Sequence, residues 1–172
     1  MQHVRRTDLR ERARPWRCKA VIGSASEKQS TMPSPIDVTY ERTFSGTPRR
    51  IFQLLSEMGT SQDAIWPFPS QPFMRSSGPL TPGTTEEWHG PFHAVLQEVE
   101  PERHITWRID TEGIDGTHRF ELEQEGRRVT LRHRLTAALA EPHGRLLWRR
   151  YEDQHERAIN GLFDKLGRVL KR

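Results

Sequence analysis

The carboxyl-terminal part of the chain carries one apolar stripe at helical spacing, and this stripe limits what the rest of the chain can fold into. From Pro142 onward the sequence predicts a single long helix. At ~1.5 Å per residue, nearly 30 residues would span roughly 40–45 Å, which is longer than a small sheet is wide. An amphipathic helix must bury its apolar face, and a sheet is the only large partner that the remaining sequence offers. The stripe consists of Leu147, Tyr151, His155, Ile159, Leu162, Leu166 and either Val169 or Leu170.

A strand and a short helix are predicted before the sheet proper. Residues 36–44 alternate apolar and polar side chains, which is typical of a half-buried strand. Thr47 and Pro48 then supply an N-cap and a first helical residue. Apolar residues at helical spacing follow as far as Met58, and Gly59 is a natural stop.

Several short strands are expected after this helix. Residues 60–82 contain five prolines and are predicted to be irregular, with a short helical turn near 61–66 and a short strand near 72–77. Further strands are predicted over residues 84–89, 92–99, 103–110, 117–124 and 127–136.

The last two of these strands flank Glu125-Gly126, a plausible hairpin turn. Closing the hairpin there places His118 opposite His133. Antiparallel strands that are clustered together, with helices outside them, predict an α+β fold. We therefore expect a curved antiparallel sheet wrapped around the long carboxyl-terminal helix, with one or two short helices after the first strand. A sheet curved in this way can leave a space between itself and the helix.

Charge is distributed unevenly along the chain. The 172 residues include 27 Lys and Arg and 23 Asp and Glu. Residues 1–31 hold eight basic and three acidic side chains, a net charge of +5, so the other 141 residues carry a net charge of −1. A body without a basic excess argues against nucleic-acid binding. The single cysteine, Cys18, excludes an internal disulfide and a cysteine-based zinc cage, and no apolar run is long enough to span a membrane.

The beginning of the chain has the composition of an arm and linker. Residues 1–33 show no sustained period, and the stretch that follows Ile22 is rich in Gly, Ser and Pro. We expect a disordered basic arm over residues 1–35 and one domain over residues 36–172. The arm lacks the apolar core of a signal peptide, which favours a cytoplasmic location. Met32 stands immediately before the domain and is an alternative start of translation.

Several short sequence motifs between residues 47 and 108 resemble those of a known family. They are Thr47-Pro48-Arg49-Arg50-Ile51-Phe52, Gly78-Pro79-Leu80 with Pro82-Gly83-Thr84, and Leu96-Gln97-Glu98-Val99-Glu100-Pro101-Glu102-Arg103 with Thr106-Trp107-Arg108. Together with the order of elements, they resemble the START-like (SRPBCC) superfamily, the polyketide cyclase/dehydrase and lipid-transport group, over about residues 36–171. The resemblance implies the helix-grip fold. It does not imply one activity, because members include ligand carriers, receptors and cyclases.

Two histidines on the predicted hairpin are the candidate catalytic residues. His118 and His133 would have Cβ atoms about 5 Å apart, on the face that carries Phe120. If this face points inward, two imidazoles enter an apolar cavity, where they could act as an acid/base pair near neutral pH. The alternative is a polar rim in which both rings bond to water. A zinc site made of this pair and Glu87 has no supporting motif spacing, so no metal is expected.

Other motifs point away from cofactor chemistry. His89 and His93 stand four residues apart, but Gly90 and Pro91 between them forbid a regular helix, so a turn between strands is the better interpretation. The chain contains no glycine-rich phosphate loop, no serine nucleophile elbow and no dinucleotide fingerprint. We therefore expect no cofactor.

Residues of the long helix and a set of aromatic side chains are the candidate cavity lining. His155 and Tyr151 either contact a ligand or fill the core. Trp66 lies in the proline-rich segment, which could act as a lid over a cavity mouth. The residues expected to bind a ligand are Trp66, Phe73, Trp88, Trp107, His118, Phe120, His133, Tyr151 and His155.

Three functions remain open at this stage. The first is a non-enzymatic carrier or sensor that binds a small hydrophobic or aromatic molecule in the cavity. The second is an enzyme similar to polyketide cyclases and dehydratases, with cavity histidines as acid and base. The third is a protein-interaction module that uses an outward stripe of Arg128, Arg132 and Arg134, unless Glu121 and Glu123 simply pair with that stripe. We expect a monomer or a weak homodimer.

Overall fold

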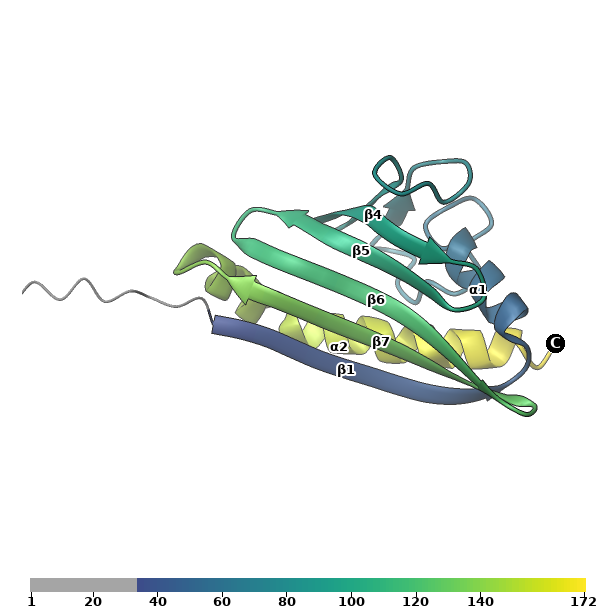
Figure 1. Ribbon diagram of the computed structural model, residues 1–172. Helices are drawn as coiled ribbons and strands as arrows, with labels where there is room; N and C mark the ends of the chain where they lie inside the picture. Colours follow the sequence, from purple (N-terminus) through teal and green to yellow (C-terminus); the bar gives the residue numbers. More distant parts are fainter. Residues whose placement is uncertain (1–33) are drawn as a thin grey trace, which may run out of the picture. The chain divides into compact units, whose positions relative to one another are not determined.

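The computed structural model describes residues 34–172, which contain one seven-stranded antiparallel sheet. The strands lie in the order β1-β7-β6-β5-β4-β3-β2. The curved sheet and the long helix behind it form the predicted α+β arrangement (Figure 1). The elements are β1 (Ser34–Ser45), α1 (Pro48–Glu57), β2 (Phe73–Arg75), β3 (Glu86–His89), β4 (Phe92–Glu100), β5 (His104–Thr111), β6 (Ile114–Glu125), β7 (Arg128–Leu139) and α2 (His143–Val169).

Local chemistry explains the position of α1. The Thr47 side chain accepts a hydrogen bond from the backbone N–H of Arg50, and Pro48 occupies the first helical position. The chain leaves the helix through Gly59, which has a φ of +75°. A Cβ atom at Gly59 would lie 2.5 Å from the ring of Phe73, so this glycine also allows the chain to pass close to β2. This is the one helix between β1 and β2 in the described part of the chain.

The helix α2 runs along the inner face of the sheet beside β1 and β7 (Figure 1). Its buried face agrees with the predicted stripe from Ile159 onward, where Leu162 and Leu166 are fully buried. Nearer its beginning the buried side chain is Trp148, and Leu147 is half-buried. No helix in residues 34–172 is long and apolar enough to cross a membrane.

The apolar interior consists of two clusters. The larger one joins α1, the middle strands and the second half of α2, and includes Ile51, Trp107 and Phe163. The smaller one lies around the beginning of α2 and includes Ile109 and Trp148. The residues of the candidate site lie against both clusters.

The β6–β7 hairpin has a different register from the predicted one. Glu125 pairs with Arg128, so the turn consists of Gly126 and Arg127, and Phe120 rather than His118 lies opposite His133. The prediction was therefore wrong by two residues. Because side chains alternate with a period of two, this shift leaves His118 and His133 on the same face of the sheet.

Two smaller expectations are also corrected. The strand β1 begins at Ser34, so the expected arm over residues 1–35 overlaps the first strand by two residues; the rest of the arm lies outside the described residues. The expected helical turn near 61–66 is a capped loop instead. There the Asp63 carboxylate accepts hydrogen bonds from the backbone N–H groups of Ile65 and Trp66.

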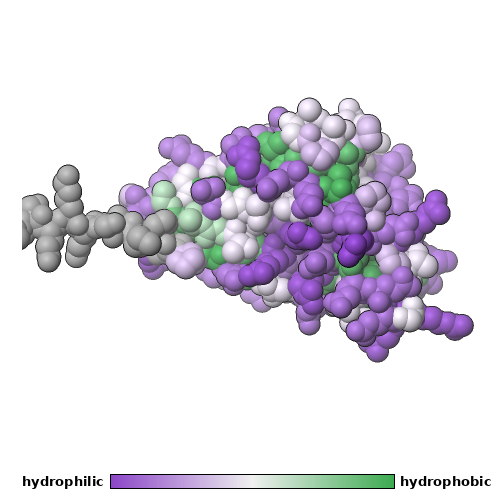
Figure 2. Space-filling model, viewed as in Figure 1, coloured by the Kyte–Doolittle hydropathy of each residue, from purple (hydrophilic) through white to green (hydrophobic). Residues whose placement is uncertain are grey.

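The outer face of the sheet is polar and its charges are paired. Arg134 forms a two-point contact with Asp37 of β1, and Arg132 lies within 4 Å of Glu41, Glu121 and Glu123. Figure 2 shows this side of the molecule covered mainly by hydrophilic residues. Acidic neighbours thus balance Arg132 and Arg134, two of the three arginines of the predicted stripe, which weakens the protein-interaction hypothesis at these two positions.

Candidate functional site

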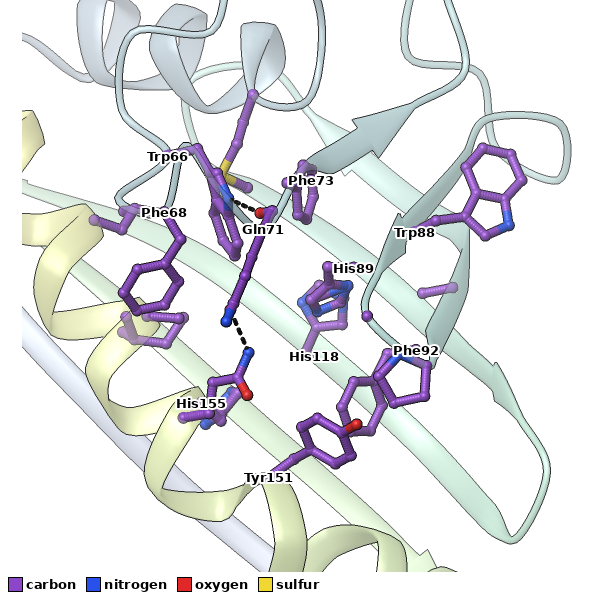
Figure 3. Close-up of a pocket in the computed structure, with 18 of the residues that line it drawn as sticks. Trp66, Phe68, Gln71, Phe73, Trp88, His89, Phe92, His118, Tyr151 and His155 are labelled. Atoms are coloured by element: carbon purple, nitrogen blue, oxygen red, sulfur yellow. Dashed lines mark hydrogen bonds between the residues drawn. The ribbon is translucent and has the colours of Figure 1, made fainter.

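A cavity of about 580 Å³ lies between the inner face of the sheet, α2 and the segment that leads into β2. Figure 3 shows the side chains of α2, β3, β6 and this segment converging on it. None of the described residues that line it is Asp, Glu, Lys or Arg. Eight of the nine predicted ligand-binding residues line the cavity, namely Trp66, Phe73, Trp88, His118, Phe120, His133, Tyr151 and His155.

The ninth predicted residue, Trp107, does not line the cavity. Its side chain is buried in the larger apolar cluster, and its ring stacks on His118 at an interplanar angle of 11°. Trp107 therefore packs beside a cavity residue, directly across from it on the neighbouring strand β5. Trp88 stands at the rim, where 37% of it is exposed and its ring stacks on His93.

A buried carboxylate touches one of the cavity histidines. Glu87 is fully buried, and its Oε1 lies 2.7 Å from Nε2 of His118. The oxygen is off the direction of the ring N–H, so the contact is close but is not an aligned hydrogen bond. Arg75 lies directly across from Glu87 in β2. Burial lowers the pKa of Arg75, and the negative charge of Glu87 opposes that shift.

Four imidazoles form a row across the cavity. The rings of His89 and His118 are 6.3 Å apart, those of His118 and His133 are 5.7 Å apart, and those of His133 and His155 are 5.2 Å apart. The row runs from β3 across β6 and β7 to α2. Each of the four rings offers a ligand polar atoms in otherwise apolar surroundings.

Three of these imidazoles are neutral near neutral pH. Burial lowers the pKa of His89 to about 4 and that of His155 to about 4, and it lowers the pKa of His133 well below the usual 6.5. Neighbouring imidazoles lower these pKa values further, whereas the charge of Glu87 raises the pKa of His89. A neutral imidazole carries one donor and one acceptor, so each ring can meet a hydroxyl or a carbonyl group.

The proline-rich segment closes one side of the cavity. Trp66 donates from its indole nitrogen to the backbone oxygen of Gln71, at 2.7 Å. Gln154 of α2 donates to the side-chain oxygen of Gln71, also at 2.7 Å (Figure 3). Lys165 donates to the backbone oxygen of Trp66. The segment is thus fastened to α2 by polar contacts. It occupies the position that the lid prediction requires.

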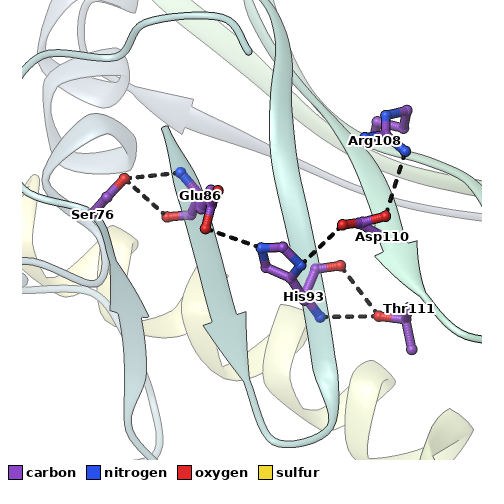
Figure 4. Close-up of polar contacts among 6 residues, drawn as sticks. All are labelled: Ser76, Glu86, His93, Arg108, Asp110 and Thr111. Atoms are coloured by element: carbon purple, nitrogen blue, oxygen red, sulfur yellow. Dashed lines mark hydrogen bonds and ion pairs between the residues drawn. The ribbon is translucent and has the colours of Figure 1, made fainter. Parts of the chain in front are cut away.

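Sequence reasoning missed two residues of this site. It considered Glu87 only as a zinc ligand, and it named His89 only for the turn between strands that follows it, which the structure confirms at Gly90 and Pro91. Both Glu87 and His89 point inward from β3. Their spacing of two was the available signal, because alternate residues of a strand face the same side. Glu86, the first residue of β3, faces outward, where it contacts His93 in a separate network with Asp110 (Figure 4).

The described residues contain no group of three or more His, Cys, Asp or Glu placed to hold a metal ion. The cavity histidines offer hydrogen bonds and proton transfer.

Comparisons with known proteins support the fold alone. No family model and no curated protein match the chain. Among solved structures, protein Ms6760 from Mycobacterium smegmatis matches with a TM-score of 0.57 and 13% identity, over 78% of this chain and 90% of that one. CalU16 from Micromonospora echinospora matches with a TM-score of 0.55 and 15% identity, over 76% of this chain and 75% of that one. DynU16, a protein in the dynemicin biosynthetic locus, matches with a TM-score of 0.55 and 16% identity, over 78% of this chain but 47% of its own.

Proposed function

We propose that this protein binds one small, neutral, mainly apolar or aromatic molecule in the cavity between the sheet and α2. The observation that carries the proposal is the lining. A space of about 580 Å³ is lined mainly by apolar and aromatic side chains and imidazoles, with no charged carboxylate, ammonium or guanidinium group among the described lining residues. Small-molecule sites typically have this size and this mixture of apolar walls with a few polar groups.

The lining also indicates which ligands are disfavoured. A carboxylate or phosphate buried in the cavity would meet no lysine or arginine among the described lining residues, so it would lose its hydration without gaining a partner. A neutral ligand avoids this cost. Its apolar surface would be removed from water at roughly 25 cal/mol per Å², which supplies most of the affinity.

The row of imidazoles would fix the orientation of the ligand. A hydroxyl or carbonyl group that reaches the row finds both donors and acceptors, because the pKa values of His89, His133 and His155 keep those rings neutral. An entirely apolar molecule would leave these nitrogens without partners. We therefore expect a ligand with at least one oxygen atom at the end that enters first.

The structural neighbours are compatible with a small-molecule role. DynU16 is described as a protein in a biosynthetic locus, and it shares the fold of this chain. At 16% identity this likeness says nothing about the identity of the ligand. The ligand class proposed for this chain rests on its own cavity.

Native mass spectrometry of the gently purified full chain tests the proposal. We expect an extra mass of a few hundred daltons in the native spectrum and its loss on denaturation. The bound mass should be depleted in Phe73→Asp, which adds a charge to the lining, and retained in Leu146→Asp, which changes an exposed side chain. A bare native protein that also fails to bind the neutral fluorescent probe 1-aminoanthracene would contradict the proposal.

A further inference from the structure

Beyond binding, we propose that the cavity is an active site in which Glu87 and His118 form a proton-transfer pair that removes a proton from a carbon next to a carbonyl group of the ligand. The geometry assigns His118 as the base that touches the ligand. It assigns Glu87 as the positioning residue that acts through His118.

The contact between the two side chains has the arrangement that such a pair needs. Glu87 Oε1 lies 2.7 Å from His118 Nε2, so the second ring nitrogen, Nδ1, is the one left to meet a ligand in the cavity that His118 lines. A buried carboxylate on one imidazole nitrogen holds the ring in one tautomer and stabilises the imidazolium that forms when the other nitrogen accepts a proton. Contacts of this kind are often poorly aligned without ligand and become aligned when it binds.

The ring of His118 is held in place from two sides. Trp107 lies directly across from it on β5 and stacks on it, and Phe120 meets it edge to face, with ring centroids 6.4 Å apart. A base held in this way keeps one orientation toward the ligand. An orientation that is fixed before the reaction lowers the entropic part of the activation barrier. This gives the buried Trp107, which contacts no ligand, a role in supporting the base.

The reaction also requires a hydrogen-bond donor for the carbonyl oxygen of the ligand, which becomes negatively charged when the proton is removed. Neighbouring imidazoles can supply this donor. His133 and His89 have rings 5.7 Å and 6.3 Å from that of His118. Their pKa values lie below the usual value because both rings are desolvated, so they are neutral N–H donors and do not compete as charged acids. Donors held in place in this way stabilise an enolate oxygen more strongly than water does, because they do not have to reorient during the reaction.

The step is balanced without an oxidant or reductant. The C–H bond next to the carbonyl breaks, its proton moves to Nδ1 of His118, and its electron pair becomes the carbon–carbon double bond of an enolate whose negative charge rests on the oxygen. The positive charge formed on His118 is paired with Glu87. Return of the proton to carbon completes an exchange, and in a β-hydroxy carbonyl compound its transfer to the departing hydroxide completes a dehydration to the unsaturated compound and water.

The same chain provides a matched control pair. On the outer face of the sheet, His104 Nε2 lies 3.3 Å from Glu98 Oε1, but Glu98 has 59% of its side chain exposed. Neither residue lines the cavity. Glu98→Gln therefore removes a carboxylate from a histidine contact, as Glu87→Gln does, without touching the proposed site.

The experiment follows the exchange of hydrogen for deuterium at carbon 1 of 2-tetralone, a flat neutral ketone, by NMR in D₂O with the full chain. We expect wild type and Glu98→Gln to accelerate exchange equally. Glu87→Gln should lower the rate at saturating ketone by about 10–100-fold while leaving the half-saturating concentration within about twofold, and His118→Phe should abolish the acceleration. Glu87→Asp, which restores a carboxylate, should recover part of the rate.

The outcomes separate this proposal from ligand binding. Ketone binding, measured in the same samples by protein chemical-shift changes, with no difference in exchange between wild type and Glu87→Gln would overturn the proton-transfer pair and leave the binding function standing. Neither binding nor exchange would overturn both. A folded Glu87→Gln that loses rate and binding together, without recovery in Glu87→Asp, would show a structural role for Glu87 and would also overturn the proposal.

Discussion

The cavity imidazoles make the stability of this protein depend on pH. Burial lowers the pKa of His155 to about 4, whereas the same side chain titrates near 6.5 when the chain is unfolded. Between these values the unfolded chain binds a proton that the folded protein does not. The free energy of unfolding therefore rises with pH across this window, and the contribution that is present above pH 6.5 is lost as the pH falls toward 4.

We predict that replacing His155 by Phe flattens this dependence. Wild type should lose about 2 kcal/mol more than His155→Phe between pH 7 and pH 5, because the variant has one less group that must gain a proton on unfolding. Urea unfolding at the two pH values measures the difference. His143→Phe, at the exposed first residue of α2, should behave as wild type does. Parallel losses in all three proteins would contradict the prediction.

At the scale of the elements, the segment before β2 can lie against α2 because one helical residue has no side chain. A Cβ atom at Gly161 would lie 2.8 Å from the Pro67 ring, whereas one at Gly167 would make an ordinary 3.6 Å contact with Phe44. Glycine inside a helix costs roughly 0.5–1 kcal/mol relative to alanine. The two glycines therefore have the same intrinsic cost to helix stability, but only Gly161 has a neighbour that a Cβ atom would clash with.

We predict opposite effects of alanine at these two sites. Gly167→Ala should raise the free energy of unfolding by up to about 1 kcal/mol. Gly161→Ala should leave it unchanged or lower it, because the segment around Pro67 must move away from α2. Urea unfolding measures both effects. Equal stabilisation by the two substitutions would show that Pro67 does not press on the helix.

The bond between Gln71 and Gln154 joins the same segment to α2 at the cavity. We predict that Gln154→Ala speeds ligand release, since breaking one hydrogen bond of about 0.5–1.5 kcal/mol allows a few-fold to tenfold faster opening. Stopped-flow measurement of 1-aminoanthracene dissociation tests this expectation. Asp153→Ala, at the exposed neighbouring position of α2, is the control. Equal dissociation rates in the two variants would mean that the segment does not limit ligand exit.

The sequence predicted elements well and their contacts poorly, for identifiable reasons. The spacing of apolar residues was sufficient for α2 from Ile159 onward and for the inward faces of β6 and β7, but it did not decide the inward face of β4. The hairpin register depended on one turn: Gly126 has a φ of +61° and takes the first central position, which places Arg127 second and moves every pair by two residues. A turn centred on Glu125-Gly126 would instead have paired Gln124 with Arg127, which is the predicted register.

The sequence was sufficient to predict residues that line the cavity, but not the contact between the two residues of the proposed proton-transfer pair. His118, His133 and His155 were found because each falls on an apolar face. The contact of Glu87 with His118 was not, because it joins β3 to β6 across the intervening strands β4 and β5. A bulge in β4 between Leu96 and Glu98 shifts the pairing along that route. If the pairing at this bulge were shifted by one residue, the side chains of one connected strand would move to the opposite face of the sheet.

At the scale of the whole molecule, residues 34–172 contain a sheet, two helices and both apolar clusters, and the side chain of Ile36 in β1 is buried. We propose that the domain starts with this strand and contains the complete ligand site. A fragment of residues 32–172 should then match the full chain within about 0.5 kcal/mol in the free energy of unfolding. At a free probe concentration of 100 times Kd, 1-aminoanthracene should stabilise either protein by about 2.7 kcal/mol.

Both readouts are needed because they fail for different reasons. A fragment that unfolds more easily but binds the probe equally would place stabilising contacts before residue 32 and leave the site within the domain. A fragment of full stability that binds the probe more weakly would mean that residues before 32 take part in the site, although Ser34 already pairs with Leu139 at the far end of β7. Chemical unfolding of both proteins, with and without the probe, distinguishes these outcomes. Equal values throughout would establish that the sheet and α2 enclose the ligand without help from the preceding residues.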